Sequence, residues 1–180
     1  MKSRSLGQIL VALGFAALGA TSSHAETSPL SPIAFLTTHE WEAKLPDSPD
    51  GRKMKIHAQF SWSQNHQAIL IRNQFLVDGQ AKPYIDGLYA WDPRQKTIVF
   101  WYVGAEGNLS KGTVKVEGEQ LVHEFEEITV DGKSTAYVAR VTPHDGAAWD
   151  NEILARSGTE LKQLVKVRYE IRFEPLRLLR

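Results

Sequence analysis

Apolar and polar residues alternate along much of this chain, with the two-residue period typical of β-strands that have one buried face. Around residue 59, the apolar positions are Ile56, Ala58, Phe60 and Trp62. Near the end of the chain, every odd position from Leu161 through Gln163 to Phe173 shares one face, and Leu164 is the only apolar interruption of the other face. The pattern predicts a dry and a wet face for each strand.

Turn dipeptides separate these segments at short, regular spacing: 50–51, 78–79, 92–93, 106–107, 117–118, 131–132, 145–146 and 157–158. No ten-residue window has helical periodicity with caps, although 31–36 fits one helical turn. The strands predicted between the turns are 38–45, 52–63, 67–78, 82–91, 97–103, 109–117, 120–130, 133–143, 148–156 and 160–173. A flat meander of this length would expose two edges, and closure removes them. We therefore expect an all-β fold, a closed antiparallel up-and-down barrel of about ten strands.

The first 25 residues have the composition of a signal peptide. Lys2 and Arg4 precede an apolar run over 9–18, and small residues end at Ala25. The run is short for a membrane span, which takes about 20 residues, but an uncleaved anchor is the alternative. We expect a periplasmic or secreted protein with a single domain over 26–173, a tail over 174–180, and no transmembrane span once the leader is removed.

The composition excludes several classes of function. Removing the leader leaves a formal charge of about −2 without a basic stripe, which argues against nucleic-acid binding. The chain has no cysteine, so disulfides and thiolate metal sites are excluded. The histidines show no metal-binding spacing, and no carboxylate pair or nucleophile motif indicates a catalytic site.

The segment 97–103 is apolar on both faces, and we expect the lead-in, the tail or a partner, such as a second copy, to cover it.

Three groups of residues resemble a known family. They are Phe35-Leu36 followed by Trp41; Tyr89 to Pro93 with 99–102 and Glu106-Gly107; and the closing Lys162, Leu164, 167–169 and Arg172. Together they resemble calycin-like barrels (lipocalins, fatty-acid-binding proteins and the nitrobindin-like group), and in particular small secreted bacterial proteins of unknown function. The resemblance covers 32–173, but His39 replaces the glycine of the lipocalin Gly-x-Trp motif. It implies a lipocalin-like barrel and, by analogy of fold, a hydrophobic ligand.

Two charged or titratable residues are candidates for the interior. His123 lies between Leu121 and Phe125 on the predicted inner face, as a hydrogen-bonded core residue, a ligand contact or a haem-iron ligand. Arg140 shares a face with Ala136 and Val138. If that face is inward, the guanidinium needs a carboxylate, from a glutamate or from a ligand.

Other candidates for ligand contacts lie on apolar faces. Tyr169, Asn73 and Asn151 would supply polar groups, whereas Trp62, Trp101 and Tyr102 would form the core or the cavity wall. Glu124, Glu126 and Glu127 are interpreted mainly as a solvated face.

The sequence therefore favours an exported barrel that binds a small apolar or amphipathic ligand. One alternative is a partner-binding envelope protein with a filled interior. The other is a haem- or lipid-processing enzyme. No cofactor is identified, and a catalytic role has no candidate residues.

Overall fold

The structure is a computed structural model, and it describes residues 28–173. Its elements are η1 (Ser31–Thr38), a 3-10 helix, and the strands β1 (Trp41–Lys44), β2 (Met54–Trp62), β3 (Ala68–Val77), β4 (Gln80–Asp92), β5 (Thr97–Gly104), β6 (Leu109–Glu117), β7 (Gln120–Ile128), β8 (Ser134–His144), β9 (Ala148–Ser157) and β10 (Glu160–Ile171). The predicted leader over 1–25 and the tail over 174–180 lie outside the described residues. Within 28–173, no helix is long and apolar enough to cross a membrane.

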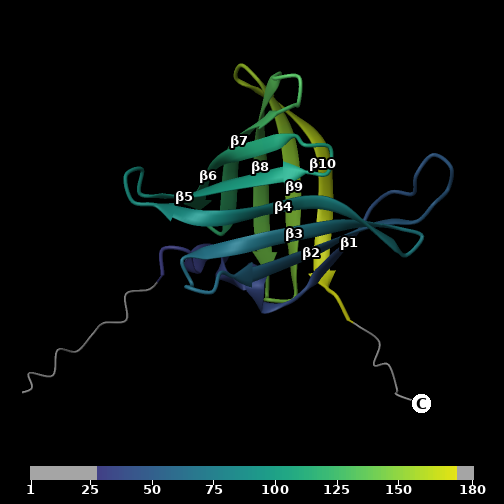
Figure 1. Ribbon diagram of the computed structural model, residues 1–180, viewed down its shortest axis with the longest axis horizontal. Coiled ribbons are helices and arrows are strands. Elements are labelled where there is room, and N and C mark those ends of the chain that lie inside the picture. The colour runs from purple at the N-terminus through teal and green to yellow at the C-terminus, as the bar shows by residue number, and fades with distance from the viewer. Residues whose placement is uncertain (1–27, 174–180) are drawn as a thin grey trace, which may run out of the picture.

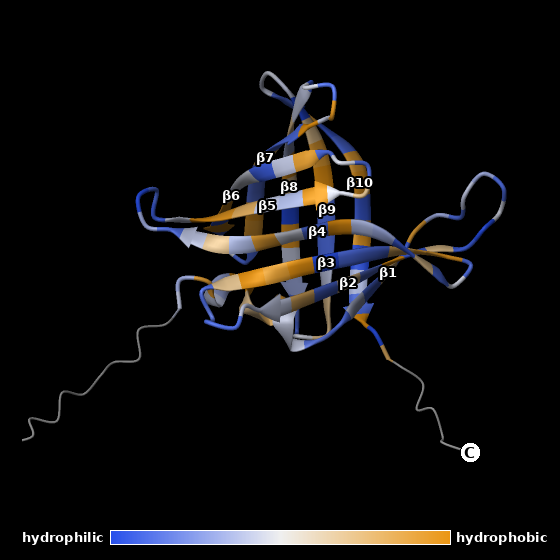
Figure 2. Ribbon diagram, viewed as in Figure 1, coloured by the Kyte–Doolittle hydropathy of each residue, from blue (hydrophilic) through white to orange (hydrophobic). Residues whose placement is uncertain are grey.

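The ten strands form one closed antiparallel barrel, as predicted (Figure 1). Each strand pairs with its neighbours in sequence, and β1 closes the ring by pairing with both β2 and β10. The closing ladder between β1 and β10 is short, running from Trp41 opposite Ile171 to Ala43 opposite Tyr169. Apolar and polar residues alternate along the strands, so that one face lines the interior (Figure 2).

The lead-in before β1 packs into the barrel core. Leu30, Ile33 and Leu36 are buried in the same cluster as Trp41 and Ile69. The indole Nε1 of Trp41 donates a hydrogen bond to the Leu36 carbonyl oxygen at 2.8 Å. The lead-in therefore closes the interior at one end, and the expectation that it could cover the outer side of 97–103 is wrong.

The predicted faces of the last strand are wrong over its first few residues. The register of β10 against β9 shifts between Gln163 and Val165, so Leu164 is a bulge residue. Before the bulge, Gln163 pairs with Leu154; after it, Val165 pairs with Ile153. Directly paired residues share a face, so Leu161 and Gln163 lie outside and the odd positions from Val165 lie inside. The apolar interruption at Leu164 marks this change of face.

Candidate functional site

Most inner-facing side chains are more deeply buried toward η1 than toward the opposite end of the barrel. Near η1 the inner-facing Trp41, Ile69 and Phe100 are at most 1% exposed. Toward the turns at 78–79, 105–108 and 129–133, many inner-facing residues are only half-buried, although Ser110 is 2% exposed. We call these half-buried residues the open cup: Asn73, Phe75, Tyr84, Ile85, Tyr102, Phe125, Glu127, Tyr137, Asn151, Ile153 and Val165.

Aromatic side chains fill the closed half. Tyr169 stacks on Trp149 with ring centroids 3.8 Å apart, and Trp149 meets Trp41 edge-on at 6.2 Å. Trp62 faces inward at the end of β2, where its ring lies 5.9 Å from that of His66. Burial raises the pKa of Tyr169. Tyr169 and Trp62 therefore belong to the packed half and do not line the open cup.

His123 and Tyr89 form a buried polar pair next to this packed half. The Tyr89 hydroxyl lies 3.1 Å from His123 Nε2, and the imidazole is 5% exposed. The Phe100 ring packs edge-on against the imidazole, with centroids 5.4 Å apart. Burial lowers the pKa of His123 to about 4, so the ring is neutral near pH 7. His123 is thus hydrogen-bonded in the interior, its contact with a ligand stays a prediction, and ligation of a haem iron through Nε2 would require Tyr89 to move.

Two asparagines bring polar groups into the interior without satisfying them. The Oδ1 atoms of Asn73 and Asn151 are buried, and neither has a hydrogen-bond partner among the described residues. Asn73 pairs with Ala58 and Ile85, and Asn151 with Val141 and Val167, in a register that points both inward. An unsatisfied buried polar group costs about 1–3 kcal/mol, so these amides are suited to a ligand or a water molecule.

Glu127 is part of the open cup, although its place beside Glu124 and Glu126 predicted a mainly solvated face. It pairs with Ser110, which is 2% exposed, and it shares the inner face with Phe125 two residues earlier. Its Oε1 accepts a long hydrogen bond of 3.4 Å from Asn108 Nδ2. Burial raises the pKa of the Tyr84 phenol, and the negative charge of Glu127 raises it further. Strict alternation from Phe125 would have placed this carboxylate inside.

Arg140 and Trp101 lie on the outer face of the barrel. Arg140 pairs with Val122 in register, and its Nη1 lies 3.5 Å from Glu152 Oε2. The apolar residues beside it form a small outer cluster, Val122, Val138 and Leu154, which is separate from the main core. Trp101 is 43% exposed, whereas the next residue, Tyr102, faces inward. The inward position considered for Arg140 is therefore wrong, because Val138 belongs to the outer cluster and Ala136 is exposed.

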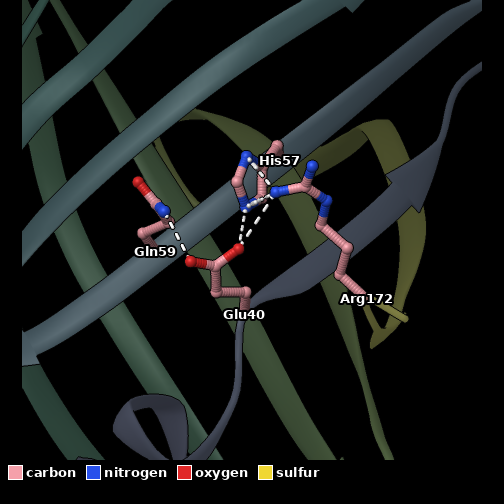
Figure 3. A network of polar contacts seen from close by, with 4 residues as sticks. All are labelled: Glu40, His57, Gln59 and Arg172. Carbon is pink, nitrogen blue, oxygen red and sulfur yellow. Dashed lines mark hydrogen bonds and ion pairs between the residues drawn. The ribbon is translucent and has the colours of Figure 1, made fainter. Parts of the chain in front are cut away.

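A second polar site lies outside, where β1, β2 and β10 meet (Figure 3). Glu40 Oε2 lies 2.9 Å from His57 Nε2 and 3.0 Å from Arg172 Nη1, and Gln59 donates to Oε1 at 2.7 Å. His57 is on the polar face that alternation predicts, yet it is only 4% exposed. Burial alone would raise the pKa of Glu40, but the hydrogen bonds from Gln59, His57 and Arg172 outweigh it and lower that pKa.

This network borders a surface depression of about 490 Å³. Its lining residues are Thr37, Thr38, His39, Glu40, Gln59, Phe60, Ser61, Leu70, Ile71 and Arg72. Every oxygen of the Glu40 carboxylate already has a partner within the network. The network joins β2 to the residue before β1 and the residue after β10, so its contacts are those of a structural clamp at the closing seam. Within the part of the chain that the structure describes, no three His, Asp or Glu residues are placed to hold a metal ion.

Comparison with known proteins agrees with the fold. No protein-family model and no curated protein matches the chain. Among solved structures, the crystal structure of Rv2717c from M. tuberculosis is similar, with a TM-score of 0.54 and 12% sequence identity. The match covers 81% of this chain and 98% of that one. At this identity the likeness shows a shared β-barrel fold and nothing about ligand or activity.

Proposed function

We propose that the protein binds a small apolar or amphipathic molecule in the open cup. One observation carries the proposal: the inner-facing Trp41, Ile69 and Phe100 are at most 1% exposed, whereas the residues of the open cup are half-buried. An interior open at one end, lined by aromatic rings with a few polar groups, has the composition of small-molecule sites. The unsatisfied oxygens of Asn73 and Asn151 support it, and so does the calycin-like resemblance of the sequence.

We further propose that the protein works outside the cytoplasm. The support is the leader-like composition of residues 1–25, with its basic start and short apolar run. The absence of cysteine from the sequence is compatible with either compartment, so the leader alone carries this part. Expression of the full chain with mass measurement of the mature product tests it. Cleavage after Ala25 is expected, and a periplasmic product of uncleaved mass would indicate an anchor.

Native mass spectrometry tests the binding proposal directly. The exported protein, purified without detergent, is compared with the same sample after denaturation. A mass excess that disappears on denaturation is expected from a bound small molecule. If no excess is found, and no lipid, haem or neutral dye binds afterwards, the filled-barrel alternative is correct.

Two neighbouring residues of β5 provide a matched pair for locating the site. Tyr102 faces the open cup and Trp101 faces outward. We expect Tyr102→Leu to weaken binding of the neutral dye Nile red about fivefold, because a wall aromatic contributes about 0.5–1.5 kcal/mol. Trp101→Leu should leave it unchanged. Equal weakening by both variants would place the dye on the outer surface.

The outer surface offers a second candidate function, binding to a partner or to a second copy. Leu70, Leu88 and Trp101 are direct cross-strand neighbours on β3, β4 and β5, and Val103 is 48% exposed on the same face. Exposed apolar patches of this kind are typical of protein interfaces. Size-exclusion chromatography with light scattering distinguishes the two candidates. A dimer that Trp101→Glu dissociates would favour this function, and a monomer at all concentrations would count against self-association.

A further inference from the structure

The open cup contains one carboxylate, and its surroundings suit a cation. Glu127 is the last inner-facing residue of β7, half-buried between Ser110 on β6 and Thr135 on β8. Among residues 28–173, its one hydrogen-bond partner is the amide of Asn108, at the long distance of 3.4 Å, so the Glu127 carboxylate keeps capacity to accept further hydrogen bonds.

Aromatic rings line the same part of the cup. Phe75 and Tyr84 are in contact, with ring centroids 4.0 Å apart, and Phe125 stacks on Tyr137 at 5.4 Å. Tyr102 lies 6.4 Å from Phe125 by the same measure. The charge of Glu127 contributes, after burial, to raising the pKa values of Tyr84 and Tyr102, as expected if the carboxylate and both phenols share one space. Aromatic faces beside a carboxylate are the recognition chemistry of alkylammonium groups.

Three basic residues, Arg140, Lys82 and Lys162, lie where they cannot make the open cup favour an anion over a cation. Arg140, the guanidinium that the sequence offered for a ligand carboxylate, is outside and paired with Glu152. Lys82 and Lys162 follow the inner register, opposite Phe75 and Ala155, but both are exposed at the rim. Solvent screens charges at the rim, whereas Glu127 is half-buried, and its field acts on any head group that enters the cup.

We infer that the open cup selects amphiphiles with an ammonium head group over those with a carboxylate, with Glu127 as the counter-charge. This rests on the proposed function, since it names the class of ligand for the same site. The ammonium would lie against the Glu127 carboxylate among the faces of Tyr84 and Tyr102. The alkyl part would contact the apolar wall formed by Phe75, Phe125 and Val165.

Displacement of Nile red by three ligands of equal chain length tests the inference: dodecylamine, dodecanol and dodecanoate, each below its micelle concentration or solubility limit. We expect the amine to bind at least about tenfold more tightly than the carboxylate, with the alcohol between them. Glu127→Gln should remove most of the difference. Glu126→Gln is the matched control. Glu126 directly precedes Glu127 and faces outward, where its carboxylate forms an ion pair with Lys111 and accepts a hydrogen bond from Ser134.

The outcomes separate the two levels of the proposal. If the dye and all three ligands fail to bind the wild-type protein, the proposed function is wrong. If they bind but dodecanoate is equal to or tighter than the amine, the proposed function stands and the inference is wrong. Loss of the preference in Glu126→Gln as well would show a long-range charge effect and overturn the assignment to Glu127. Glu127→Asp, which keeps the charge, should retain the preference and guards against misreading a variant that folds poorly.

Discussion

The two neighbouring tryptophans of the core, Trp41 and Trp149, differ in one hydrogen bond, and this difference predicts unequal effects of the same substitution. Trp41 and Trp149 are 0% and 4% exposed and touch each other. Trp41 Nε1 donates to the Leu36 carbonyl at 2.8 Å, whereas Trp149 Nε1 has no hydrogen-bond partner within residues 28–173. Replacing either residue by phenylalanine removes the same volume, so the cavity cost is similar at the two sites.

The hydrogen bond should decide the difference in the free energy of unfolding. Trp41→Phe leaves the buried Leu36 carbonyl without its partner, which costs about 1–3 kcal/mol. Trp149→Phe removes a buried donor that was already unsatisfied. We therefore expect Trp41→Phe to be the more destabilising variant by about 1–3 kcal/mol, and to lower Tm by several degrees more.

Urea unfolding followed by far-ultraviolet circular dichroism measures both variants without relying on tryptophan emission. Hydrogen exchange should also show faster exchange in η1 for Trp41→Phe only, because that bond holds the helix against the barrel. If Trp149→Phe is equally or more destabilising, the hydrogen bond does not make the difference and the reasoning fails.

Two further predictions concern acid stability and strand packing. Glu40→Gln should make the stability of the fold less sensitive to acid. Because the pKa of Glu40 is lower in the folded state than its unfolded value near 4.5, the ionised carboxylate stabilises the fold above that pH. This stabilisation is lost as the pH falls through the folded-state pKa. The effect should stay below about 1 kcal/mol because the carboxylate is largely exposed. The free energy of unfolding is measured with urea at about pH 6 and about pH 3.5, and equal losses in variant and wild type would contradict the prediction. Gly112→Ala should destabilise by about 3 kcal/mol, because a Cβ there would lie 2.1 Å from the Glu124 carbonyl oxygen and 2.5 Å from Phe125 Cβ. Gly104→Ala is the control, since its nearest contact would be 3.8 Å, and similar Tm values for both variants would show that the strands adjust.

Alternation predicted the barrel and most of its faces, because one side of each strand is dry. The inner positions of Phe60 and His123 follow from it directly. It failed at Leu161, because the bulge at Leu164 changes the face and a bulge leaves no fixed signature in sequence. It failed at Arg140 because an outer apolar cluster makes both faces of β8 resemble a core.

The candidate site was harder to predict than the fold. Asn73, Asn151 and Tyr102 were identified from their apolar faces and are in the open cup. Tyr84 and Glu127 were missed, because membership of the open cup depends on which end of the barrel η1 covers. That depends on contacts such as Trp41 with Leu36, which are fixed by tertiary packing and not by the pattern within a strand.

The short closing strand has a consequence for the order in which the protein folds. Glu40 and Arg172 are separated by 132 positions, yet they meet beside the seam between β1 and β10. Every other ladder of the barrel joins strands adjacent in sequence, so these can form as successive hairpins. The ring can close only after the last strand has emerged from the translocation or synthesis machinery. Until then β1 and the most recently formed strand both present unpaired edges, which leaves the unclosed chain open to aggregation.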